Sequence, residues 1–194
     1  MRTLVRFTLV MALALLTGPQ VVAAQSGTAQ TSVLAPLRTQ WENTRHLVEG
    51  LAAQVPEDKY DFRPTPEVRS FRELFKHLIG ENFRFMAQAA GETAPIEMSV
   101  IEALNGRDEI LQALKDSYDY GVKVWTGMTD QKAMEMIAGR GGQPQARWAP
   151  ILANIIDNMN HYGNLVVYVR LNGMVPARTA GQPQRQPSPP PTQR

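Results

Sequence analysis

The sequence predicts an all-α protein, a four-helix bundle with short extra helices. Four long segments place apolar residues every three or four positions, which is the spacing of a helix with one buried face. Capping and stop residues stand at several of the expected helix ends, and no segment alternates convincingly as a half-buried strand would. The 194 residues leave about 150 between two atypical ends, enough for a single domain with its own core.

The first 24 residues have the pattern of a secretion signal. Arg2 and Arg6 precede an apolar run over residues 7–16, and Val22 and Ala24 then offer compact side chains at the −3 and −1 positions of a cleavage site. The run is shorter than the roughly 20 residues that a permanent membrane helix needs. We therefore expect a signal peptide over residues 1–24 and an exported, periplasmic or secreted protein without a stable membrane span.

The first two long helices flank a proline-rich loop. Residues 34–55 keep a helical apolar period, whereas residues 56–69 contain three prolines and are expected to form an ordered loop held by Tyr60 and Phe62. Ser70 and Glu73 then make an S-x-x-E capping box. The second helix is expected to follow this box directly and to stop at Gly91.

The second half of the chain is expected to hold two more long helices and shorter elements. Ser99 and Glu102 repeat the capping box at a short turn, and Pro150 suits the first turn of the last helix. The expected segments are a third long helix centred on residues 110–125, a short helix from Thr129-Asp130 to about Ile137, a Gly-rich loop over residues 138–146 and a last helix ending near Asn172.

The remaining residues, 178–194, consist mostly of Gln, Pro, Arg and Ser, and this composition predicts a disordered tail after a domain spanning residues 25–177. The net charge of +2 depends on five arginines in the signal and tail, so the domain itself is slightly acidic. No basic face indicates a nucleic-acid partner. The absence of cysteine excludes disulfides, thiolate ligands and a cysteine nucleophile.

A candidate metal site follows from the three histidines. Asp157 and His161 are four residues apart, so a helix places them on one face, close enough to share an ion. His77, midway along the second helix, can supply a third ligand, and Glu81 lies one turn from it. His46 has no ligand partner on its own helix face, and we expect it to be structural or exposed.

An alternative interpretation of Asp157 and His161 remains open from spacing alone. Both lie roughly opposite the apolar stripe of the last helix, where solvent-facing residues belong. However, Asp157 is the only charged residue between Arg147 and Arg170, whereas an exposed helix face of that length normally carries Lys or Glu. The last helix is therefore expected to be buried on more than one side.

Three stretches of the chain resemble the DinB-like (DinB/YfiT) family. They are residues 59–71 (KYDFRPTPEVRSF), residues 77–82 (HLIGEN) and residues 157–165 (DNMNHYGNL) with their continuation to Pro176. The resemblance implies a four-helix bundle with a divalent metal held by one histidine of the second helix and an H-x-x-x-H pair of the last. His77 and His161 match this pattern, whereas Asp157 stands where the first histidine of the pair is usual.

The leading functional hypothesis is a metal-dependent hydrolase or thiol transferase acting on a small molecule. The resemblance implies a divalent ion, with zinc, nickel, manganese and iron all open, held by His77, Asp157 and His161, and Glu81 is a weak candidate for a catalytic base. The alternative is a non-catalytic bundle that binds a small ligand or a protein partner without metal. A homodimer is compatible with either hypothesis.

Overall fold

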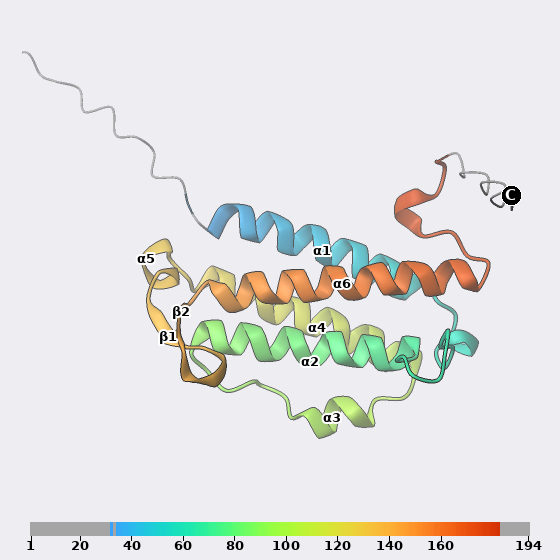
Figure 1. The fold of residues 1–194 in the computed structure, drawn as a ribbon, viewed down its shortest axis with the longest axis horizontal. Helices are drawn as coiled ribbons and strands as arrows, with labels where there is room; N and C mark the ends of the chain where they lie inside the picture. Colours follow the sequence, from blue (N-terminus) through green and yellow to red (C-terminus); the bar gives the residue numbers. More distant parts are fainter. Residues whose placement is uncertain (1–31, 33, 183–194) are drawn as a thin grey trace, which may run out of the picture. The chain divides into compact units, whose positions relative to one another are not determined.

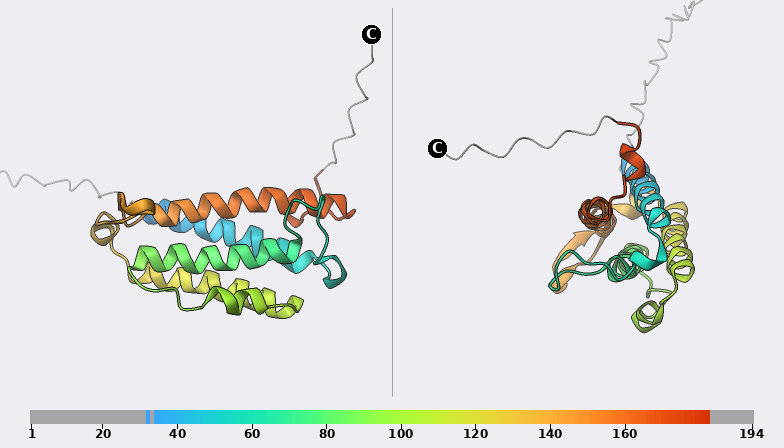
Figure 2. Two further views of the ribbon diagram at one scale, coloured as in Figure 1. Left: turned by 60° about the horizontal axis from the view of Figure 1, so that its bottom comes forward. Right: turned by 90° about the vertical axis from the view of Figure 1, so that its right-hand side faces the viewer.

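A computed structural model of the chain describes residues 32 and 34–182, and the expected signal peptide of residues 1–24 lies outside them. The described part is a four-helix bundle, which confirms the predicted fold class (Figure 1). Its long helices are α1 (Leu34–Gln54), α2 (Phe71–Ala90), α4 (Arg107–Thr126) and α6 (Ala149–Leu171). Both α1 and α2 pack mainly against α4 and α6, so α1 and α2 face each other diagonally across the bundle (Figure 2).

The core lies along the axis between the four helices and is built from their apolar stripes. Trp41 of α1 and Tyr118 of α4 are fully buried, and their rings meet edge to face with centroids 5.1 Å apart. Every long helix contributes several fully buried side chains, among them Trp41, Phe71, Phe75, Leu78, Ile79, Met86, Ile110, Leu114, Tyr118 and Ile151.

The ends of α2 are formed as predicted. The Ser70 hydroxyl accepts the backbone N–H of Glu73, and the Glu73 carboxylate accepts the backbone N–H of Ser70, which completes the capping box. At the other end, Gly91 has φ 78°, a left-handed conformation in which a side chain would be strained. The two caps stabilise the ends of α2, the helix that carries His77.

The loop between α1 and α2 is ordered through aromatic packing. Tyr60 is fully buried beside Phe75 of α2, and Phe62 packs against Phe71 and Tyr168. The loop also contains the 3-10 turn η1 (Glu57–Lys59), after which the backbone N–H of Arg72 donates to the Tyr60 carbonyl at 2.8 Å. The loop thereby covers the end of the bundle near the start of α2.

The short helix α3 (Met98–Ala103) departs from the predicted capping. It begins one residue before Ser99, and its N-cap Glu97 makes no side-chain capping bond, so the second predicted box is wrong. The carboxylate of Glu109 instead accepts the N–H groups of Asn105 and Gly106. These two bonds start α4 at Arg107, after a break at Asn105 and Gly106 where the sequence offers one.

The predicted short helix from residue 130 to about Ile137 is half correct. The helix α5 (Asp130–Ala133) ends early, and β1 (Met136–Ala138) pairs antiparallel with β2 (Pro144–Ala146). Between the strands, the turn η2 (Arg140–Gly142) contains two glycines with positive φ, which reverse the chain. The backbone of residues 136–138 consequently bonds to residues 144–146, so the expected loop is a small hairpin.

The described chain ends in the 3-10 turn η3 (Ala177–Thr179), which lies against α1, so the expected domain boundary after residue 177 falls inside this turn. None of the helices in the described residues combines the length and apolarity that crossing a bilayer requires.

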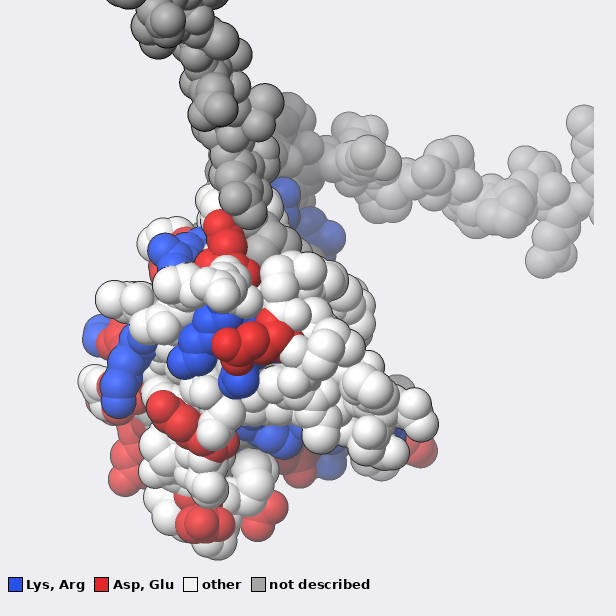
Figure 3. Space-filling model, turned by 90° about the vertical axis from the view of Figure 1, so that its left-hand side faces the viewer, with Lys and Arg blue, Asp and Glu red and all other residues white. Residues whose placement is uncertain are grey.

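At the end of the bundle that carries α5 and the hairpin, acidic and basic side chains are interspersed (Figure 3). That face therefore presents no large area of a single charge sign.

Candidate metal centre

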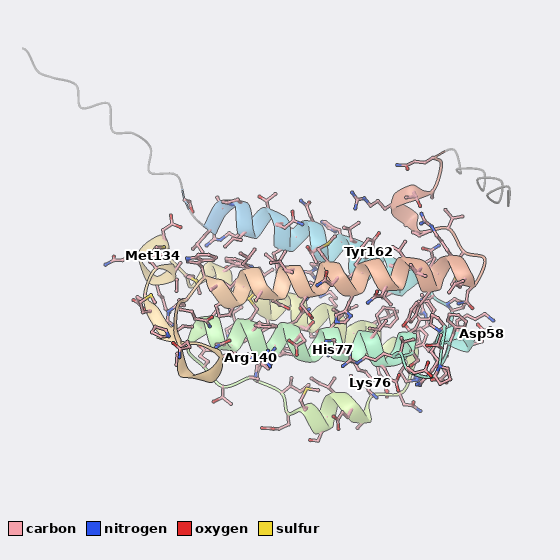
Figure 4. All side chains as sticks on the ribbon, in the orientation of Figure 1. Asp58, Lys76, His77, Met134, Arg140 and Tyr162 are labelled. Carbon is pink, nitrogen blue, oxygen red and sulfur yellow. The ribbon has the colours of Figure 1, made fainter. Side chains whose placement is uncertain are left out.

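Helices α2 and α6 bring His77, Asp157 and His161 together. Each residue offers one ligand atom, and the three atoms lie within 4.8 Å of one another. Figure 4 shows His77 on α2, at the middle of the bundle and beside α6. Asp157 and His161 share one face of α6 because they are one helical turn apart. The three candidate ligands from two helices therefore form one cluster.

The contacts inside the cluster leave polar atoms without partners. The Nε2 atoms of His77 and His161 lie 3.8 Å and 3.7 Å from the Asp157 carboxylate oxygens, which is too long for hydrogen bonds. Oδ2 of Asp157 and Nδ1 of His161 are buried and bond to no described residue. Buried polar atoms without partners are costly, and a bound cation would satisfy the carboxylate oxygen.

The spacing of the cluster fits a small divalent ion. With metal–ligand distances of about 2.1 Å, two ligands of a tetrahedral ion lie about 3.4 Å apart. The two histidine–carboxylate separations, one to each Asp157 oxygen, exceed this value by only a few tenths of an ångström, and one ligand atom from each of the three residues lies within 4.8 Å of the others. The two imidazole rings stand edge to face with centroids 4.7 Å apart. Small side-chain rotations would therefore bring all three ligands to bonding distance.

The cluster is partly shielded from solvent. The exposed fractions of the side chains are 24% for His77, 31% for Asp157 and 15% for His161, so Asp157 and His161 do not stand on an open solvent face. Burial lowers the pKa of His77, and the charges of Arg69 and His161 lower it further, whereas Glu81 and Asp157 act in the opposite direction. The lowered pKa favours the neutral imidazole, which is the form that binds metals.

A buried amide network fixes α6 against α2 beside the cluster. Oδ1 of Asn82 accepts the side-chain amides of Asn154 and Asn158 at 3.1 Å and 3.0 Å, and Nδ2 of Asn82 donates to the Ser117 hydroxyl at 3.0 Å. The Tyr118 hydroxyl donates to Oδ1 of Asn158 at 2.6 Å. All of these side chains are buried. The network sets the register in which Asp157, next to Asn158, faces α2.

Other residues singled out in the sequence lie outside the cluster. Glu81 forms an ion pair with Arg84 on α2, and it is not among the three grouped ligands. His46 is exposed on α1. Asn82, which is buried on α2 beside this cluster, bonds to side chains of α4 and α6.

A pocket of about 650 Å³ opens beside His161. Its wall includes Arg69 and Val68 from the loop before α2, and Asn164 and Tyr168 from α6. The sequence patterns do not single out Arg69 as a site residue, nor the hydrogen-bonded amides of Asn154 and Asn158 on α6. The available signal for Arg69 is a charged residue directly before the capping box of the helix that carries His77.

The fold and the cluster together define a class, a four-helix bundle with a candidate divalent metal centre between two of its helices. Residues 37–165 match the model of the DinB superfamily, so the chain belongs to this superfamily. The crystal structure of a DinB-like protein from Bacillus subtilis, YjoA, is similar in fold, with a TM-score of 0.61 at 21% sequence identity. The match covers 72% of this chain and 93% of that one. No curated protein is significantly similar in sequence.

Proposed function

We propose that the chain binds one divalent metal ion through His77, Asp157 and His161 and acts on a small molecule bound at that ion. The observation that carries the proposal is the Asp157 carboxylate: its Oδ2 is buried, unpartnered and 3.8 Å from Nε2 of His77, and its Oδ1 is 3.7 Å from Nε2 of His161, separations close to those of metal ligands. Two imidazoles and one carboxylate suit zinc as well as iron, manganese and nickel.

The three side chains would leave coordination positions open. A divalent ion held there would supply Lewis-acid chemistry, lowering the pKa of a bound water or thiol. Burial keeps His77 neutral and ready to bind, and the negative charges of Asp157 and Glu81 favour a cation beside it. The pocket beside His161 gives a small molecule access from one side. Hydrolysis or thiol transfer is the reaction class that we propose for this arrangement.

Metal analysis tests the proposal. The chain is purified without a polyhistidine tag, and bound zinc, nickel, manganese and iron are measured by mass spectrometry and by titration calorimetry. We expect about one ion per chain, lost in His161→Ala and in His77→Ala. His46→Ala is the matched control, because His46 is exposed and outside the cluster, and it should keep the metal.

Two outcomes contradict this proposal. A chain that remains metal-free, with a melting temperature unchanged by added ions, would indicate the alternative function, a bundle that binds a ligand or partner without metal. Equal loss of metal in His46→Ala would show that the ions bind to histidines unspecifically.

We also propose that the chain is exported by the signal in residues 1–24. Expression of the full sequence in a bacterium, followed by cell fractionation and N-terminal sequencing, should yield a product that begins at Gln25 outside the cytoplasm. A product that keeps Met1 and stays with the cytoplasmic fraction would rule out this proposal.

A further inference from the structure

Arg69 differs from its neighbours in having no partner. Arg63 forms an ion pair with Glu73, and Arg72 pairs with Asp61. The guanidinium of Arg69, in contrast, makes no hydrogen bond or ion pair with any residue that the structure describes. An unpaired guanidinium beside a pocket offers several N–H donors in a planar fork that matches the two oxygens of a carboxylate.

The backbone of Arg69 is held in place although its side chain is not. The Tyr168 hydroxyl of α6 donates to the Arg69 carbonyl at 2.9 Å, and the next residue, Ser70, is the N-cap of α2. The Tyr168 ring in turn packs edge to face on Phe71, with centroids 5.4 Å apart. The backbone of Arg69 is thus fixed at the wall of the pocket, between the two helices that supply the candidate metal ligands.

Arg69 lines the same pocket as His161, one residue of the metal cluster. The lining of the 650 Å³ pocket includes both Arg69 and His161, with Val68, Leu74 and Asn164 also on its wall. The positive charge of Arg69 is close enough to contribute to the lowered pKa of His77. A molecule bound at the cluster and extending into this pocket would therefore pass apolar side chains and reach a guanidinium.

The charges of the pocket favour a ligand with a single negative charge. Glu67 also lines the pocket, and like Arg69 it is exposed; the Thr65 side chain and its own backbone N–H lower the pKa of its carboxyl group, which favours the charged form. One unpaired arginine with a carboxylate nearby balances one negative charge better than the two charges of a phosphate monoester. A carboxylate is consequently the better match.

We propose that Arg69 binds the carboxylate of the small molecule on which the chain acts, and that this molecule is a short carboxylic acid whose other end reaches the metal. The inference rests on the proposed metal function, because it takes the cluster as the second point of attachment. It makes Arg69 a specificity-determining residue.

The test compares two hydroxamates that bind zinc by the same group and differ only in charge at the far end. Succinic monohydroxamic acid carries a carboxylate where butyrohydroxamic acid has a methyl group. Calorimetry on the zinc-loaded full chain should show about tenfold tighter binding of the acid, as expected for a charge-assisted bond to arginine near a surface. Arg69→Gln should remove the preference and leave the affinity for butyrohydroxamic acid unchanged, while Arg69→Lys should keep part of it.

Arg140→Gln is the matched control, since Arg140 is an exposed arginine in the hairpin and lines neither Arg69's pocket nor the cluster. It should keep the full preference for the acid. Equal affinity of the wild-type chain for the two hydroxamates would overturn the Arg69 proposal while leaving the metal function intact. A preference that survives in Arg69→Gln would overturn it too.

A metal-free measurement separates the two proposals. In the chain without zinc, the Nε–H signal of Arg69 in a nitrogen-15 NMR spectrum should shift on addition of succinate and stay unchanged with succinamide. If the metal analysis finds that the chain cannot bind zinc, but this signal shifts with succinate, the metal function is wrong and the carboxylate site at Arg69 is supported. No shift with succinate, in a chain that does bind zinc, would count against Arg69 alone.

Discussion

The amide of Asn82 is expected to be one of the most costly polar groups to remove from this protein. It makes three side-chain hydrogen bonds that join α2 to α4 and α6. In Asn82→Ala, Nδ2 of Asn154 loses its only described acceptor, whereas Asn158 keeps its bonds to Asn154 and Ser117 keeps its bond to the Leu114 carbonyl. One buried amide is thus left without a partner and two further bonds are lost.

The magnitude follows from these losses. An unsatisfied buried amide costs about 1 to 3 kcal/mol and each lost hydrogen bond about 1 kcal/mol. The small cavity adds about 1 kcal/mol, so the free energy of unfolding of Asn82→Ala should fall by about 4 to 6 kcal/mol. Asn82→Leu keeps most of the volume and isolates the polar contribution, with an expected loss of about 3 to 5 kcal/mol. Such losses are a large part of a domain's total of about 5 to 15 kcal/mol.

Urea denaturation followed by circular dichroism measures both the free energy of unfolding and its denaturant slope. Asn160→Ala is the control on α6, because Asn160 is exposed and outside the network, and it should change stability by less than about 0.5 kcal/mol. Losses below about 1 kcal/mol in both Asn82 variants would refute the reasoning that this network holds the helices in register.

Three further predictions concern the site and its helices. Because the pKa of His77 is lowered, the unfolded chain binds a proton that the folded chain does not at pH values just below the ordinary value of 6.5. The unfolding free energy of metal-free protein should therefore rise with increasing pH through this range, and less steeply in His77→Gln. An unfolding free energy from urea denaturation that does not change with pH would contradict this. Gly121→Ala should cost about 2 to 3 kcal/mol in urea denaturation because the new methyl group overlaps the Trp41 ring, whereas Gly163→Ala, with open space around it, should stabilise α6 by about 0.5 to 1 kcal/mol. Asp157→His should raise the ratio of zinc to manganese affinity at least about tenfold, since imidazole nitrogen suits zinc and carboxylate oxygen suits manganese; an unchanged ratio in calorimetry would show that residue 157 is not a ligand.

Local sequence signals predicted the long helices well because their causes are local. The Ser70 box and the Gly91 stop act within one or two turns of backbone, and both ends of α2 are where those residues predict. The hairpin over residues 136–146 was missed because its strands are only three residues long and none of their residues is buried, so no apolar face marks them. Its pairing depends on the glycine turn between them and not on the strand residues.

That the three candidate ligands lie close together was predictable from the sequence. The i, i+4 spacing of Asp157 and His161 indicates a shared face, His77 was the available third ligand on the second helix, and the resemblance to the DinB family supports the set. The helical wheel of a single helix assigns that face to solvent, whereas the lack of Lys and Glu on it predicted its partial burial. Partial burial of the pair arises from α2, and the position of Arg69 arises from the bond between Tyr168 and its carbonyl. Both effects come from contacts between residues far apart in the sequence, which local patterns do not reveal.

The placement of the cluster on α2 and α6 has a consequence for folding kinetics. His77 and Asp157 lie about 80 residues apart, so a large loop must close before the third ligand meets the other two. A metal ion would then bind the native state far better than the unfolded chain. It would hold α2 and α6 together and lower the rate at which they separate. The unfolding rate would thus depend on the metal concentration, and chains without bound metal would be degraded first by proteases.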